Sequence, residues 1–483
     1  MTTNACRFRL AAGQDKTLLE FGLRRAQGTD GAMSASRYSS IGGFDATSNV
    51  LAGKTFGIDV RGTHAHSFVS TYTSIDELKQ RMLAHNPECP GKPAEGAPNS
   101  SKIDGGKFEV APGSDSYKKQ ADGSMDLLAR AWAWRQFLGF ESTSASELAA
   151  FVAYALAFPD GFLALVDTYE TLQSGVPNFI VVALALLELG YAPNGVRLDS
   201  GDLAYLSKET RKVIRESDAR TGATVADQAK IVASNSINEA VLNSLNDQGH
   251  EIDVFGIGTN LVTCQAQPAL GMVFKLVEVN GAARIKISQE ITKVTIPGAK
   301  EAYRLIGRDS SPLLDVLIAR GEGVPTAGRR MLCRHPFDEK KRVYVTPSFV
   351  MPLLAPVWLG NTSSEYVSGA VVREADGTAG AGAAAAGGGN EASAESGAGS
   401  KEREAAAASA GAAALPIKSP CGTRCRLPAM PELKQYVAEQ LILLREDHLR
   451  PLNPTPYKVS VSAGLYQFVH ELWSQEVPIP ELG

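Results

Sequence analysis

The stretch GVRLDSGDL, Gly195 to Leu203, places one guanidinium, two carboxylates and a hydroxyl at the end of an apolar run. Arg197 can hold a carboxylate or a phosphate through two parallel hydrogen bonds. Asp199 and Asp202 can accept hydrogen bonds from sugar hydroxyls or lie near a hydrated Mg²⁺. The alternative is an internal salt bridge, because strand alternation points Arg197 and Asp199 to the same face. The stretch therefore indicates an anion and sugar site or a structural ion pair.

A second candidate is GTHAHSF, in which His64 and His66 share one face of an expected strand. The two could form a metal pair, but no third ligand lies nearby in the sequence. A single histidine acting as a nucleophile or an acid–base group is the better interpretation. A buried structural histidine is the alternative reading of either residue.

Two further strand ends carry small polar residues. GIGTN, Gly256 to Asn260, offers backbone N–H groups and a hydroxyl that could hold a phosphate, although a plain tight turn gives the same pattern. VASNS adds Ser234, Asn235 and Ser236 at the neighbouring strand end, which favours anion binding. By itself the pair Arg24 and Arg25 in EFGLRRAQG indicates only a solvated basic surface.

These residues must be positioned by alternating strands and helices. GVRLDS, AKIVASNS and EIDVFGIGT are short apolar stretches, and the segments between them carry apolar residues at helical spacing. Asn238 or Ser236 could cap the second helix, and Gly249 closes it. Strand, helix, strand at these intervals predicts βαβ units of a parallel sheet, whose reactive groups lie where strands end.

Other elements follow from the same patterns. GIDVRGTHAHSFV is a strand candidate, and SIDELKQRMLAH after it predicts a helix. Asn280-Gly281 suits a type I′ hairpin turn. PELKQYVAEQLILLREDHLR predicts one amphipathic helix. The longest apolar run, NFIVVALALLELGY, is too short to cross a bilayer and carries Glu188, so we expect a buried helix.

Length and composition set the class of protein. The chain has 483 residues, 44% of them hydrophobic, and a net charge of -4, so we expect more than one domain and no attraction to nucleic acid or anionic membrane. The six scattered cysteines suit a reducing compartment, and Cys421 and Cys425 are read as loop thiols. Residues 371–417 hold almost no large apolar residue, which predicts a disordered Ala/Gly-rich insert. Residues 85–123 are rich in Pro, Gly, Ser and Lys, which predicts a second loop insert.

Together these sites imply an anionic, phosphate-bearing sugar ligand, and here the chain resembles the eukaryotic nicotinate phosphoribosyltransferases. The resemblance rests on LEFGLRRAQG, SSIGGFDATSNVLAG, GTHAHSF, FVAYALAFPDGF, LVDTYETLQSGVPNF, GVRLDSGDL and GIGTNLVTC. It implies an α/β fold, the type II phosphoribosyltransferase, with an irregular α/β barrel core and a second, incomplete α/β domain. The expected barrel core comprises residues 1–84 and 124–335, and the second domain residues 336–370 and 418–483.

The resemblance also implies a reaction, in which nicotinate and 5-phosphoribosyl-1-diphosphate give nicotinate mononucleotide and pyrophosphate, with ATP hydrolysis through a phosphohistidine. The phosphorylated histidine of the motif precedes Ser, which here makes His66 the catalytic residue, whereas His64 sits where the family is often apolar. Arg197 matches the arginine that pairs with the pyridine carboxylate. Thr63 matches a position that contacts nicotinate, and Thr259 matches a contact to phosphoribosyl diphosphate. Arg24, Asp199 and Gly258 match substrate-binding positions of the sister nicotinamide enzyme. Ser234 and Asn235 are expected to bind substrate because of their place at the end of a strand.

The resemblance further implies Mg²⁺, ATP as co-substrate and a homodimer with sites between subunits, and we expect a cytosolic location. The metal ligands are left open, with Asp202, acting through water, as one candidate. Family members have an N-terminal portion before TNACRFRLAAG, so we expect this chain to lack part of the second domain. Two alternatives stay open. One is a non-catalytic isoform that associates with full-length subunits, and the other is a phosphoribosyltransferase for another pyridine base, nicotinamide or quinolinate.

Overall fold

The computed structural model of the chain describes residues 1–87, 123–269, 271, 273–354 and 429–476. Contacts divide the chain into unit 1, Met1–Ala269, and unit 2, Leu270–Gly483. This corrects the expected boundary at residue 335, because strands β12 (Lys300–Ile306) and β13 (Pro312–Ala319) pair within the sheet of unit 2. The insert predicted at residues 371–417, the pair Cys421 and Cys425, and most of the loop predicted at residues 85–123 lie outside the described residues.

Unit 1 is built on a parallel sheet of seven strands in the order β3-β2-β1-β9-β8-β7-β6. Taken in a circle, the strands of this sheet follow one another in chain order, as they do in a barrel, but β3 and β6 are not paired with each other. The sheet is therefore an open barrel, and the gap between β3 and β6 is its seam. The strands are β1 (Thr17–Glu20), β2 (Ala46–Thr47), β3 (Asp59–Val60), β6 (Leu163–Leu165), β7 (Gly195–Leu198), β8 (Lys230–Ala233) and β9 (Val254–Ile257).

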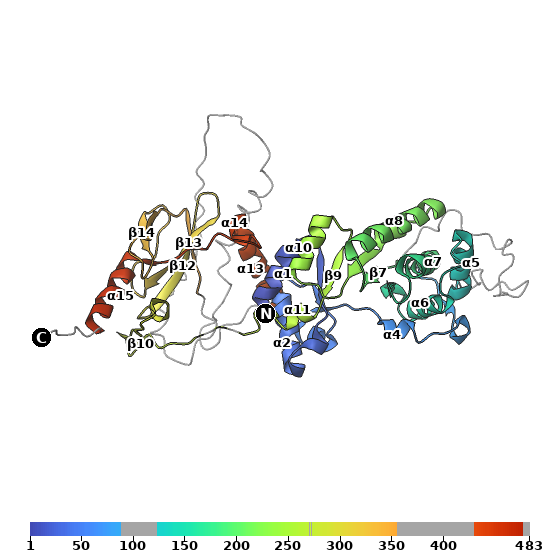
Figure 1. Cartoon of the computed structure of the whole chain (residues 1–483), viewed down its shortest axis with the longest axis horizontal. Helices are drawn as coiled ribbons and strands as arrows, with labels where there is room; N and C mark the ends of the chain where they lie inside the picture. The colour runs from blue at the N-terminus through green and yellow to red at the C-terminus, as the bar shows by residue number, and fades with distance from the viewer. Residues whose placement is uncertain (88–122, 270, 272, 355–428, 477–483) are drawn as a thin grey trace, which may run out of the picture. The chain divides into compact units, whose positions relative to one another are not determined.

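The predicted βαβ units are confirmed. Helix α8 (Leu203–Thr221) joins β7 to β8, and α10 (Glu239–Gln248) joins β8 to β9 (Figure 1). The Asn238 side chain caps α10 by accepting a hydrogen bond from the Val241 N–H, and Gly249 ends the helix with a φ of 65°. These caps turn the chain between helix and strand, and so place the residues after each strand at one edge of the sheet.

The long apolar run forms helix α7 (Val176–Glu188), which packs against α5 (Leu127–Leu138) and α6 (Ala145–Ala157) at one end of unit 1 (Figure 1). Among the described residues one helical stretch, Thr171–Glu188, is long and apolar enough to match a membrane span, and 78% of it is buried within the protein. The expectation of a buried helix is therefore confirmed.

Shorter elements complete unit 1. They are α1 (Thr2–Ala12), α2 (Gly28–Ile41), α3 (Val50–Phe56), α4 (His66–Val69), α9 (Val225–Gln228), α11 (Thr259–Val262), the strand pair β4 (Met82–Leu83) and β5 (Met125–Asp126), and single turns at Leu23–Arg25, Ile75–Glu77, Pro159–Gly161 and Thr171–Gly175.

Unit 2 holds a mixed sheet of six strands in the order β15-β14-β17-β13-β12-β16. Besides β12 and β13 these are β14 (Met331–Arg334), β15 (Arg342–Val345), β16 (Phe349–Pro352) and β17 (Val459–Ser462), with helices α13 (Met430–Leu443), α14 (Glu446–Leu449) and α15 (Ala463–Glu476). The predicted hairpin is confirmed as β10 (Glu278–Val279) and β11 (Ala282–Ala283), where Asn280 and Gly281 have φ of 48° and 76°. Unit 2 is thus a second α/β body, as predicted.

Three predicted elements differ. The helix expected at SIDELKQRMLAH is one turn, Ile75–Glu77, because Leu78 leaves the helical path with ψ 97° and is buried in the core. The single helix expected from Pro431 is broken into α13 and α14 by the extended Leu444. The strand expected through the histidines ends at Val60.

Candidate active site

The polar side chains singled out in the sequence lie at or follow the carboxyl ends of strands β1, β3, β7, β8 and β9. Because these strands are parallel neighbours or border the open seam, their ends meet at one edge of the sheet. The edge therefore gathers residues that are far apart in the sequence, as a ligand site of an α/β barrel requires.

Arg197 is the centre of this edge. Its guanidinium donates from Nε to Ser234 Oγ at 2.8 Å, from Nη1 to Thr63 Oγ1 at 3.0 Å and from Nη2 to Asp199 Oδ1 at 3.1 Å. It also lies over the ring of Phe21, 5.4 Å from the centroid. The side chain is 17% exposed. Three strand ends thus hold the guanidinium in one orientation.

The internal ion pair between Arg197 and Asp199 forms, as strand alternation allows. Asp199 Oδ1 also accepts a short hydrogen bond from Ser234 Oγ, so arginine, aspartate and serine form a closed triangle. The ion pair and a ligand site are compatible, because the triangle uses one oxygen of the carboxylate and two of the five N–H groups of the guanidinium, one on Nε and one on Nη2.

His66 pairs with Asp167, a residue that the sequence analysis did not single out. His66 Nε2 lies 3.1 Å from Asp167 Oδ1, and the His66 side chain is 43% exposed whereas that of Asp167 is 1% exposed. Asp167 Oδ2 accepts from the Asp199 N–H at 3.0 Å and from Ser200 Oγ at 2.5 Å. Asp167 follows the apolar stretch FLALV as Asp199 follows GVRL, so the rule of polar residues at strand ends could have found it.

His64 is a buried structural histidine, 9% exposed. Its Nε2 accepts a hydrogen bond from the Leu165 N–H at 3.1 Å, and burial lowers the pKa of the imidazole to about 4. The expectation that His64 and His66 share a strand face is wrong, because His64 lies in the loop after β3 and His66 begins α4.

The remaining predicted residues lie at the same edge. Ser234 is buried and Asn235 exposed, at a turn where Asn235 and Ser236 have φ of 86° and 52°. Gly258 and the exposed Thr259 begin α11 after β9. Arg24 is exposed beyond β1. Left-handed residues outside glycine are costly and are often kept at binding sites, which suits the loop of Asn235.

The described residues contain no group of three His, Cys, Asp or Glu side chains that could hold a metal ion. Asp202 caps α8, with Oδ1 accepting from the Tyr205 N–H at 3.0 Å. Mg²⁺ is commonly held by one or two carboxylates together with substrate phosphates. Asp199 and Asp202 fit that pattern, and they do not fit a metal cage made by protein alone.

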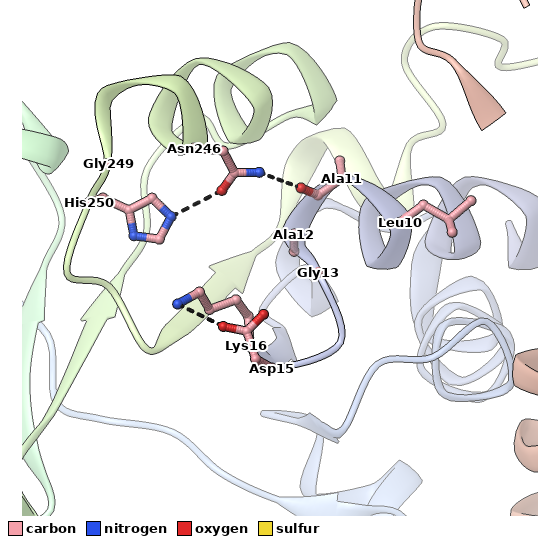
Figure 2. A pocket seen from close by; sticks show the side chains of 9 residues that line it. All are labelled: Leu10, Ala11, Ala12, Gly13, Asp15, Lys16, Asn246, Gly249 and His250. Carbon is pink, nitrogen blue, oxygen red and sulfur yellow. Dashed lines mark hydrogen bonds and ion pairs between the residues drawn. The ribbon is translucent and has the colours of Figure 1, made fainter. Parts of the chain in front are cut away.

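A surface pocket lies elsewhere, among residues that precede β1 and β9 (Figure 2). Its polar groups pair with one another: Asn246 Nδ2 donates to the Ala11 carbonyl at 2.7 Å, and His250 Nε2 lies 3.2 Å from Asn246 Oδ1. Lys16 and Asp15 form an ion pair at 3.1 Å. Because these residues precede the strands, the pocket is at the opposite edge of the sheet from Arg197.

Comparison with known proteins agrees with this geometry. The nicotinate phosphoribosyltransferase C-terminal domain matches residues 299–374 and 421–469. Nicotinate phosphoribosyltransferase 1 of Arabidopsis thaliana is 45% identical over all of this chain, which covers 72% of that protein. The Dictyostelium discoideum nicotinate phosphoribosyltransferase is 44% identical, again over all of this chain and 67% of that protein.

The crystal structure of human nicotinic acid phosphoribosyltransferase superposes with a TM-score of 0.66 at 34% identity, over 98% of this chain and 73% of that one. The match extends over both units, so the predicted barrel core and second α/β domain are confirmed together. On sequence identity, coverage and fold, the chain belongs to the nicotinate phosphoribosyltransferase family.

Proposed function

We propose that this chain transfers the phosphoribosyl group of 5-phosphoribosyl-1-diphosphate to nicotinate, the first step of NAD synthesis from nicotinate. The observation that carries the proposal is the arrangement of Arg197. Its three nitrogens each donate one hydrogen bond to the protein, which leaves two of the five N–H donors without a partner in the described part of the chain. Two N–H groups are what a carboxylate takes in a bidentate pair.

The pyridine ring would lie beside Phe21, whose ring already packs against the Arg197 guanidinium. Nicotinate brings a second carboxylate, which the two remaining N–H donors of Arg197 can bind, whereas the uncharged amide of nicotinamide would leave these donors without a charged partner. Removing one partner of such a pair costs about 2–5 kcal/mol. The same site therefore accepts the acid and rejects the amide.

The sugar phosphate would lie on the other side of Arg197. Asp199 can accept from the ribose hydroxyls, and the backbone N–H groups of Asn235, Gly258 and Thr259 and the Thr259 hydroxyl can bind phosphate oxygens, with Arg24 nearby. Mg²⁺ bound with the diphosphate, near Asp199 and Asp202, would neutralise charge on the leaving group.

In the transfer the bond from ribose C1 to the diphosphate oxygen breaks and a bond from C1 to the pyridine nitrogen forms. Positive charge builds on the sugar ring, and negative charge on the departing diphosphate. The protein therefore works mainly by orientation: Arg197 aligns the pyridine, and the loops after β8 and β9 hold the phosphates in line.

ATP would enter the reaction through His66. Because Nε2 faces Asp167, Nδ1 is the nitrogen left to attack the γ-phosphorus of ATP. The new N–P bond forms as the bond from that phosphorus to the bridging oxygen of ADP breaks. Asp167 stabilises the positive charge on the ring and keeps its proton on Nε2. Water then releases phosphate from Nδ1.

The test uses the purified chain with phosphoribosyl diphosphate, Mg²⁺ and ATP, and offers nicotinate, nicotinamide or quinolinate in turn. Nicotinate mononucleotide, separated by chromatography, and pyrophosphate are expected with nicotinate alone. Preference for another base would assign a different pyridine substrate. Absence of any product would favour the non-catalytic isoform, in which case activity should appear only on mixing with full-length subunits.

We further propose a cytosolic homodimer. Cys6, Cys264 and Cys333 are free thiols, which suits a reducing compartment. Val50, Leu51 and Val60, near the β3 edge, are 68%, 54% and 48% exposed and could pack against a second copy. Light scattering of the purified chain would give twice the mass of one chain, and a single-chain mass would refute the dimer.

A further inference from the structure

The open seam of the sheet lies next to the proposed nucleophile. Strands β3 and β6 end the sheet on its two sides. The Val166 N–H donates to the Arg197 carbonyl at 3.1 Å, toward β7. Since successive N–H groups of a strand point in opposite directions, the Leu165 N–H points into the seam. Leu165 is 1% exposed, so this N–H needs a partner from the protein.

His64 is that partner. Its Nε2 accepts from the Leu165 N–H at 3.1 Å, and the rings of Tyr154, Phe68 and Phe151 surround it with centroids 4.8, 5.4 and 6.0 Å away. Among charged and titratable groups, Arg197 and His66 act on it, both disfavouring a second proton. Burial in the same direction keeps the imidazole neutral, and only a neutral ring can accept.

Two residues further along each segment, the loop after β3 and the end of β6 meet again. His66 Nε2 reaches Asp167 Oδ1 at 3.1 Å, so residues 64 and 66 face residues 165 and 167 across the seam. We infer that His64 is a positioning residue, which fastens the loop after β3 to β6 and thereby holds His66 against Asp167. The inference rests on the proposed function only for the role of His66.

The test compares a variant that loses the hydrogen-bond acceptor of His64 with a variant that keeps an acceptor but loses the aromatic ring. His64→Phe keeps an aromatic ring among Tyr154, Phe68 and Phe151 but cannot accept a hydrogen bond. His64→Gln places an amide oxygen near the position of Nε2. The matched control is His250→Phe, because His250 Nδ1 also accepts a backbone N–H, that of Ile252 at 2.9 Å, at the opposite edge of the sheet.

We expect His64→Phe to lower kcat and the rate of His66 phosphorylation from labelled ATP about tenfold, with the KM for nicotinate within about twofold of wild type. His64→Gln should recover most of that loss, and His250→Phe should leave kcat unchanged. Wild-type kcat in His64→Phe, or equal losses in the Phe and Gln variants, would overturn the inference.

A second measurement does not depend on activity. Hydrogen exchange of the peptide containing Leu165 should quicken at least about tenfold in His64→Phe and stay slow in His64→Gln. Unchanged exchange would refute the inference even if the chain proved inactive, whereas an inactive wild type with this change in exchange would refute only the proposed function. Should His64→Phe fail to fold, His64→Asn, whose amide is too short to reach, replaces it.

Discussion

A single arginine serves two purposes in this site. The ion pair with Asp199 and the hydrogen bonds to Ser234 and Thr63 fix the Arg197 guanidinium before any ligand arrives. Ordering a long side chain costs up to about 2 kcal/mol, and here the folded protein has already met that cost. A structural salt bridge is therefore what makes this residue a good receptor for an anion.

Arg197→Lys tests that role, because lysine keeps the charge but loses the planar fork. We expect kcat/KM for nicotinate to fall at least about thirtyfold, from the loss of about 2 kcal/mol or more of a half-buried charged pair. The preference for nicotinate over nicotinamide should shrink in the same steady-state assays.

Arg211→Lys is the matched control for that substitution. Arg211 is a buried arginine that pairs with Asp253 at 2.7 Å, and Asp253 precedes β9 at the far edge of the sheet. Its replacement should affect stability and leave the choice of base unchanged. An equal loss of selectivity in the two variants would mean that Arg197 does not contact the acid.

At the scale of elements, the sequence predicted those whose patterns are local. The strands β7, β8 and β9 are apolar runs, and Asn238 and Gly249 mark the ends of α10, so each could be predicted without the rest of the chain. The helix expected after Ser74 failed because burial of Leu78 in the core of unit 1 overrides its helical spacing. The contact of His66 with Asp167 spans 101 positions, and no local pattern encodes such a distance.

The start of helix α7 depends on glycine at position 175, where a side chain would collide with the backbone of Val166. Gly175 precedes α7, and a Cβ built there would lie 1.9 Å from the Val166 carbonyl oxygen. Val166 precedes Asp167, so Gly175→Ala should displace the carboxylate that holds His66. We expect a loss of about 1–3 kcal/mol in the free energy of unfolding and a reduced kcat.

Gly161→Ala is the comparison, since a Cβ there would meet only Phe158 Cβ, at an ordinary 3.6 Å. Urea unfolding and steady-state rates of both variants check the prediction. A Gly175→Ala enzyme as stable and active as Gly161→Ala would show that the backbone around Val166 can yield without moving Asp167.

At the scale of the whole molecule, the stability of the chain depends on two buried titratable groups beside the site. Glu147 is fully buried, and its Oε2 accepts from Ser174 Oγ at 2.6 Å and from Asn178 Nδ2 at 3.0 Å. Burial raises its pKa to about 7, whereas burial lowers the pKa of His64 to about 4. The folded protein favours the neutral form of both groups. Neutral Glu147 therefore stabilises the fold at low pH, and neutral His64 stabilises it at high pH.

For Glu147 the folded pKa lies above the usual value of 4.5. Its contribution is therefore fully present below pH 4.5 and is lost as the pH rises through about 7. Glu147→Gln removes the ionisation, so the variant should gain on the order of 3 kcal/mol relative to wild type between pH 4.5 and pH 8. Urea unfolding at several pH values measures this difference, and a constant difference would contradict a carboxyl group that is neutral when folded.

For His64 the sign is reversed, because the folded pKa lies below the usual value of 6.5. The stability that depends on the neutral ring is fully present above pH 6.5 and is lost as the pH falls through about 4. His64→Gln cannot be protonated and keeps an acceptor for the Leu165 N–H, so it should gain on the order of 3 kcal/mol relative to wild type between pH 6.5 and pH 4. The same unfolding series measures it, with Glu147→Gln as the internal control, because its gain over wild type grows as the pH rises whereas that of His64→Gln grows as the pH falls. If wild type and His64→Gln lose stability in parallel as the pH falls, then the folded chain protonates the imidazole as readily as the unfolded chain does, and the ring is not held as the neutral acceptor that closes the seam.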